Sequence, residues 1–268
     1  MIEILFLFGP SLLASIFSAG ALASLGPHLI LRQLVFQLFP VHQFLMFLGL
    51  VLGLWIKDHV LLKWVVLGVG LLPSYFMFKM PFKNRESFLI VLYLLGLSLN
   101  LLIVRFFSEL EIHFTRGFFG DPTLISYSSA AMLLILGAMM LIFLVGFRDR
   151  LLKLSFELSS FSMNQSDRVL EKVFRLALTF ILMGFLLEWG FLFCLAALFL
   201  PAILLSSQSG SWSRFQTQLA VVAASGCLLG FLSSILIENV AATPAIVLGI
   251  LISSLCCLFK SEIARKIK

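Results

Sequence analysis

Charged residues are scarce in this sequence. Only 12% of its 268 residues are Asp, Glu, Lys or Arg, about half the share of a soluble domain. The apolar segments also lack the alternation of apolar and polar residues that strands of a membrane barrel require. Hydrophobic residues make up 61% of the chain, and uninterrupted apolar runs are long enough to cross a bilayer as helices. The composition therefore predicts an all-α polytopic membrane protein.

Sequence motifs of nucleotide binding and catalysis are also missing. There is no Gly-x-x-x-x-Gly-Lys phosphate loop, and the dipeptide Gly-Lys does not occur. Gly-x-Ser-x-Gly, His-Glu-x-x-His and Cys-x-x-Cys are absent as well. We therefore expect no enzymatic activity and no covalently bound cofactor in this chain. The four cysteines lie in apolar runs and are interpreted as small core residues.

Nine apolar segments are candidate transmembrane helices. The sixth and seventh are separated only by Glu188-Trp189-Gly190 and could form one broken helix, so we predict eight or nine spans within one transmembrane domain, residues 1–268. The segments are residues 5–31, 34–56, 60–80, 87–107, 126–147, 173–187, 190–205, 215–237 and 243–259.

The net charge of +6 is open to two interpretations, nucleic-acid binding or membrane topology. In membrane proteins, Lys and Arg are concentrated in cytoplasmic loops. With nine spans and the N-terminus outside, 15 of the 19 basic residues lie on the inner side and 4 on the outer side. This distribution predicts an outside N-terminus and a cytoplasmic C-terminus, with lipid and not nucleic acid as the surroundings.

The longest polar interruption is the stretch 148–172, which this topology places in the cytoplasm. Its apolar residues Leu151, Leu154, Leu158 and Phe161 recur at intervals of three or four. That spacing indicates a short amphipathic helix along the inner face of the membrane. An interfacial anchor and a docking surface for a soluble partner would both show this pattern.

The predicted outer loop, residues 106–125, contains Glu111, His113 and Asp121. Carboxylate oxygen and imidazole nitrogen are ligands that zinc and manganese accept. The loop is therefore a candidate metal mouth, and a solvated acidic loop is the alternative.

Two further histidines are candidates for a substrate path. His42 lies near the cytoplasmic end of the second predicted span, and His59 follows Asp58 at an outer turn. Ionisable groups inside a membrane are costly and are usually functional. A structural, hydrogen-bonded histidine is the alternative at both positions.

Five short stretches, in this order along the chain, resemble the membrane permeases of zinc- and manganese-uptake ABC transporters. The resemblance covers nearly the whole length. The stretches are GPHLILRQL (26–34), FFGDPTLIS (118–126), LKLSFELSSFS (152–162), WGFLFCLAALFLPA (189–202) and TPAIVLG (243–249).

The resemblance implies a permease of the bacterial cytoplasmic (inner) membrane. It implies a homodimer, a pair of cytoplasmic ATPase subunits that hold the ATP, and an extracytoplasmic solute-binding protein. The transported ion would be Zn²⁺ or Mn²⁺. The family's coupling helix, which contacts the ATPase, corresponds to residues 155–164. The coupling residues implied are Ser155, Phe156, Glu157, Phe161 and Asn164.

The second span departs from the family pattern, in which an acid and a histidine lie one helical turn apart. Leu38 or Phe39 replaces the acid, and His42 or Gln43 stands near the histidine. Leu94 occupies the place of a further histidine of some members. Metal import remains the leading hypothesis. A permease for another small solute and a non-transporting scaffold subunit are the alternatives.

Overall fold

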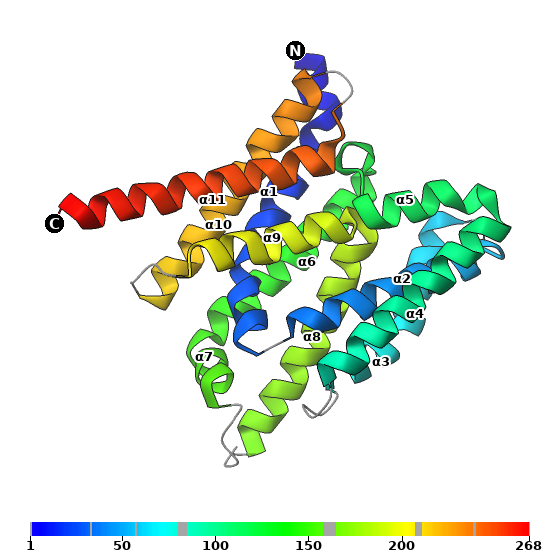
Figure 1. The fold of residues 1–268 in the computed structure, drawn as a ribbon, viewed down its shortest axis with the longest axis horizontal. Helices are drawn as coiled ribbons and strands as arrows, with labels where there is room; N and C mark the ends of the chain where they lie inside the picture. The colour runs from blue at the N-terminus through cyan, green and yellow to red at the C-terminus, as the bar shows by residue number, and fades with distance from the viewer. Residues whose placement is uncertain are drawn as a thin grey trace. The chain divides into compact units, whose positions relative to one another are not determined.

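The computed structural model describes residues 2–32, 34–56, 58–79, 85–157, 165–206, 211–237 and 240–267. Helices dominate these ranges, and none of the residues described lies in a strand. The elements are α1 (Ile2–Leu31), η1 (Val35–Gln37), α2 (Leu38–Gly53), α3 (His59–Lys79), α4 (Arg85–Phe106), η2 (Ser108–Leu110), α5 (Glu111–Phe119), η3 (Pro122–Leu124), α6 (Tyr127–Gly146), α7 (Arg148–Glu157), α8 (Gln165–Trp189), α9 (Phe191–Leu204), α10 (Trp212–Leu236) and α11 (Ala242–Ile267) (Figure 1).

The all-α membrane class is confirmed. Within the described ranges, six helical segments are long and apolar enough to cross a bilayer. Shorter apolar stretches lie in α3 and α9. The total of eight or nine spans and the orientation of the termini stay predictions. The six segments are Phe8–Leu31, Val35–Gly53, Phe88–Phe106, Tyr127–Gly146, Trp212–Leu236 and Ala242–Ser261.

The predicted sixth and seventh segments are two helices, α8 and α9, separated by Gly190. Gly190 has φ +77°, a left-handed backbone conformation that interrupts a right-handed helix. Gly120, which follows α5, has φ +73° and lies against Gly190. A Cβ on Gly120 would approach the carbonyl oxygen of Trp189 to 1.9 Å. The two glycines therefore allow a close backbone contact that any side chain would prevent.

The polar stretch and the outer loop are more helical than a simple connector. The amphipathic helix predicted in the polar stretch is present as α7, with Leu151 and Leu154 buried. Leu158 and Phe161 lie outside the described residues. The stretch expected to form the outer loop contains the nine-residue helix α5.

The chain forms two compact units. The first comprises residues 1–27, 119–146 and 188–268. In it α11 packs against α9 and α10, and Gly226 and Gly230 of α10 lie against the backbone of α11 near Ile250 and Ile246. The second unit comprises residues 28–118 and 147–187, and in it α2 packs against both α3 and α4.

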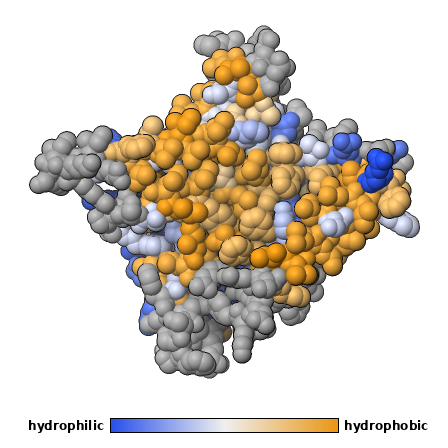
Figure 2. Space-filling model, viewed as in Figure 1, coloured by the Kyte–Doolittle hydropathy of each residue, from blue (hydrophilic) through white to orange (hydrophobic). Residues whose placement is uncertain are grey.

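Apolar side chains cover most of the described surface in the view of Figure 2. Large hydrophobic residues are exposed on several helices, among them Ile142, Val145 and Leu236. Water-soluble monomers rarely expose apolar areas of this extent. The surface is that of a protein surrounded by lipid.

Candidate functional site

The contact between α2 and α4 contains a buried pair of amide side chains, Gln43 and Asn100. Their side chains are 1% and 0% exposed. Asn100 Nδ2 donates to the backbone oxygen of Gln43 at 3.0 Å and to its side-chain Oε1 at 2.8 Å. Gly96 lies one turn before Asn100, and a Cβ there would come within 2.7 Å of Gln43 Cβ. We call this contact, with Phe39 and Tyr93, the α2–α4 seam.

The hydrogen bonds of the seam fix the orientation of both amides. A backbone carbonyl only accepts, so the Asn100 atom beside it must be the NH₂ group. The Gln43 atom beside that NH₂ must then be the oxygen. Gln43 Nε2 and Asn100 Oδ1 have no hydrogen-bond partner in the part of the chain that the structure describes. The seam therefore offers one uncharged donor and one uncharged acceptor.

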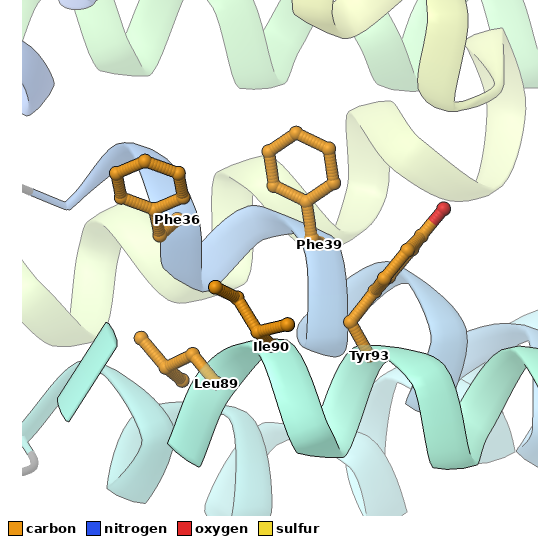
Figure 3. A pocket seen from close by; sticks show the side chains of 5 residues that line it. All are labelled: Phe36, Phe39, Leu89, Ile90 and Tyr93. Carbon is orange, nitrogen blue, oxygen red and sulfur yellow. The ribbon is translucent and has the colours of Figure 1, made fainter. Parts of the chain in front are cut away.

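One helical turn from the amides, the seam becomes apolar. A pocket of about 180 Å³ is lined by Phe36, Phe39, Leu89, Ile90 and Tyr93 (Figure 3). Phe36 and Phe39 come from η1 and the start of α2, and the other three side chains come from α4. The rings of Phe39 and Tyr93 meet edge to face, with centroids 5.5 Å apart. At this position the seam presents aromatic surface in place of a carboxylate.

The structure also decides which neighbouring positions of α2 face α4. Phe39 and Gln43 lie four residues apart, which puts them on one face of the helix, and both contact α4. His42 is also buried, but its ring packs against Phe118, with centroids 5.9 Å apart. Of the two positions considered for the histidine, Gln43 is the one in the seam.

The predicted outer ligands do not gather into a metal site in the described residues. No group of three or more His, Cys, Asp or Glu side chains is found there. Glu111 is exposed at the start of α5. Asp121 belongs to the first unit, where its carboxylate accepts hydrogen bonds from the backbone nitrogen and the hydroxyl of Thr123. The side chains of His59 and His113 lie outside the described part.

Ser155 is the predicted coupling residue whose side chain the structure describes. It is 6% exposed, and its hydroxyl accepts a hydrogen bond from Arg32 Nε at 3.0 Å. Ser155 therefore joins α7 to the end of α1. The side chains of Phe156 and Glu157, and all of Phe161 and Asn164, lie outside the described residues. The ATPase contact stays a prediction.

Sequence reasoning overlooked Asn100 and Glu171. Asn100 is an amide within an apolar run, and a polar residue in a span is a useful indicator of a buried partner. Glu171 lies in the polar stretch 148–172, for which the sequence predicts no buried ion pair, but it is 8% exposed and pairs with Arg32. The sequence holds no indicator of that pairing, because the two residues are far apart along the chain.

Comparisons with known proteins agree with this architecture. A sequence model of the ABC 3 transport family matches residues 5–261. Among solved structures, PsaBC from Streptococcus pneumoniae in complex with Fab is similar, with a TM-score of 0.76 and 18% sequence identity. The alignment covers 95% of this chain and 93% of that chain, and at this identity it shows a shared fold. A comparison with curated protein sequences finds no match.

Proposed function

Since the chain belongs to the ABC 3 transport family, we propose that it is the membrane-spanning permease subunit of an ATP-driven importer. The match over residues 5–261 carries the proposal. The six apolar helical segments and the fold shared with PsaBC support it. A transport subunit of this family is not itself an enzyme, and ATP would be hydrolysed by a separate cytoplasmic subunit.

The partners follow from the same proposal. Two copies of the chain would form the membrane part, in a bacterial cytoplasmic membrane, with a pair of ATPase subunits on the inner side. A solute-binding protein would deliver the substrate from the outer side. The amphipathic helix α7 supports a soluble partner on the inner side, since its exposed residues include Asp149, Arg150 and Lys153.

A divalent metal ion is the first candidate substrate. The resemblance to zinc and manganese permeases supports it. The seam contributes one amide oxygen, Asn100 Oδ1, that accepts no hydrogen bond from the described residues. An oxygen ligand suits Mn²⁺ better than Zn²⁺, because Zn²⁺ prefers imidazole and thiolate. Among the two metals, we therefore propose Mn²⁺.

Another small solute, uncharged or chelated, is the second candidate, and the composition of the seam favours it. Gln43, Asn100, Phe39 and Tyr93 are all neutral. Moving a bare divalent cation past uncharged groups inside a membrane is costly without a carboxylate to compensate its charge. A molecule with an apolar part and a hydrogen-bonding group matches this surface.

The two candidates are separated by transport in purified vesicles. The chain would be reconstituted with the ATPase encoded beside it, and ATP-dependent uptake of radioactive Mn²⁺ and Zn²⁺ would be measured. Manganese uptake that exceeds zinc uptake supports the first candidate. An intact complex that hydrolyses ATP but takes up neither ion contradicts it and leaves the neutral solute. Uptake by the variant Gln43→Leu would be measured beside the wild type. The substitution should change uptake only if the seam lines the path of the substrate.

A further inference from the structure

Arg32, the residue after the last turn of α1, is buried with all its side-chain nitrogens bonded. Its Nε donates to Ser155 Oγ at 3.0 Å, and its Nη2 donates to the backbone oxygen of Leu151 at 3.2 Å. Its Nη1 donates to the carboxylate of Glu171. The guanidinium carbon lies 4.2 Å from the ring centroid of Phe174. We call these five residues the Arg32 cluster, and all of them belong to the second unit.

The cluster connects three separate segments of the chain. Leu151 and Ser155 are on α7, whereas Glu171 and Phe174 are on α8. The guanidinium donates to residues of both helices, so it links the end of α1 to α7 and to α8. Ser155 Oγ also donates to the oxygen of Leu151 at 2.8 Å, which fixes its rotamer. A displacement of α7 must therefore pull on Arg32 or break its bonds.

The α8 side of the cluster is stiffened by a second ion pair. Arg175 Nε donates to the other carboxylate oxygen of Glu171 at 2.7 Å, one helical turn away on α8. Thr179 Oγ1 donates to the backbone oxygen of Arg175 at 2.7 Å. The two carboxylate oxygens of Glu171 thus accept from two different arginines, Arg32 and Arg175. The position of the carboxylate is therefore set by α8 as well as by Arg32.

We propose that Arg32 is a positioning residue that transmits movement of α7 to α8 and to the turn between α1 and α2. The inference rests on the proposed function, since it assumes an ATPase that moves α7. Phe36 and Phe39 of the seam follow Arg32 by four and seven residues, and Ser155 is one of the predicted coupling residues. The cluster therefore links the predicted ATPase contact to the candidate substrate path. Arginine suits this role because its planar group reaches three acceptors in fixed directions, whereas lysine presents a single flexible ammonium.

The test compares Arg32→Lys and Ser155→Ala with the matched control Arg105→Lys. Arg105 is an exposed arginine in the last turn of α4, which the predicted topology places on the outer side, opposite the predicted ATPase contact. Each variant is purified with the ATPase, and hydrogen exchange is measured with and without ATP and vanadate. Exchange is followed in α7 and in residues 31–38, and ATP hydrolysis is measured on the same samples.

The wild-type complex and the control should respond to nucleotide in both regions. In Arg32→Lys the response of α7 should persist, while the response of residues 31–38 should fall about tenfold, within the usual range of coupling between sites. Ser155→Ala removes one of the two bonds from Arg32 to α7 and keeps the bond to the Leu151 oxygen and the Arg32–Glu171 pair. The response of residues 31–38 should therefore fall by a smaller factor than in Arg32→Lys, and this second variant keeps the test valid if Arg32→Lys fails to fold.

Responses of residues 31–38 that equal the wild-type response in every folded variant, Arg32→Lys or Ser155→Ala, would overturn the transmission role. A parallel loss of yield, hydrolysis and both exchange responses would also overturn it, because that outcome indicates a structural role alone. If the wild-type chain binds no ATPase, the proposed function fails first, and that failure is visible before any variant is compared.

Discussion

At the scale of single residues, the Arg32–Glu171 ion pair is nearly inaccessible, with side-chain exposures of 1% and 11%. Burial lowers the pKa of Arg32 from its ordinary value, and the neighbouring Glu171 carboxylate opposes that shift. Arginine nevertheless stays charged at physiological pH. The carboxylate is therefore required to compensate a charge that cannot be removed by deprotonation.

Removing the negative partner should destabilise the protein strongly. We expect Glu171→Gln to lower the free energy of unfolding by about 3 kcal/mol, because it leaves a buried charge uncompensated. Asp149→Asn is the control, since it breaks an exposed pair worth about 0–1 kcal/mol. Thermal unfolding in detergent measures both. Equal shifts of the melting temperature in the two variants would show that groups other than Glu171 compensate the charge of Arg32.

The amide pair of the seam should contribute less. Asn100→Leu removes both hydrogen bonds to Gln43 and should cost about 0.5–2 kcal/mol, the range for polar contacts between transmembrane helices. Gln43→Leu should cost less, because the bond to its backbone oxygen remains. Ser98→Ala, which removes an exposed hydroxyl from α4, is the control. A cost for Gln43→Leu above that of Asn100→Leu would contradict the assigned bonds.

At the scale of elements, the break between α8 and α9 is determined by backbone geometry. Gly190→Ala would place a Cβ 2.4 Å from the nitrogen of Gly120, at φ +77°. We expect a loss of more than about 2 kcal/mol, since the backbone of Gly190, with φ +77° and ψ 169°, is in a region essentially restricted to glycine. That conformation alone costs about 1–3 kcal/mol for a residue with a side chain, and the clash adds to it.

A glycine with free space around it provides the comparison for Gly190. Gly68 lies within α3 with no atom near its virtual Cβ, so Gly68→Ala should stabilise the helix by about 0.5–1 kcal/mol. The melting temperatures of the two variants should shift in opposite directions. A similar loss of stability in both would mean that the close contact between Gly120 and Gly190 contributes little.

The helices that could be predicted from the sequence are those with long, uninterrupted apolar runs. Long apolar runs predicted five helices, and most of their observed ends lie within a few residues of the predicted ones. These helices are α1, α4, α6, α10 and α11. The exception is the end of α11, which continues into the polar tail. Hydropathy left the boundary between α8 and α9 open, because it does not report the positive φ of Gly190. The helix α5 was missed, because the outer stretch was interpreted by its charged residues and not by its helical spacing.

At the scale of the whole molecule, residue order and composition predicted the class and the family. The candidate site was predicted only in part. His42 and Gln43 were indistinguishable in the sequence, and helix packing was needed to put Gln43 against Asn100. The Arg32 cluster joins residues more than a hundred positions apart, as the Arg32–Ser155 bond shows. Such pairs are fixed by tertiary packing and leave no local pattern.

The proposed role as an ATPase-driven permease subunit is tested by the composition of the complex that the chain forms in lipid discs. The chain would be co-expressed with the ATPase encoded beside it and purified through a tag on the chain alone. The mass of the purified complex would then be measured by native mass spectrometry. If the chain is a permease of this family, the spectra should show a complex of two copies of the chain and two ATPase subunits. Recovery of the folded chain without any ATPase would contradict it.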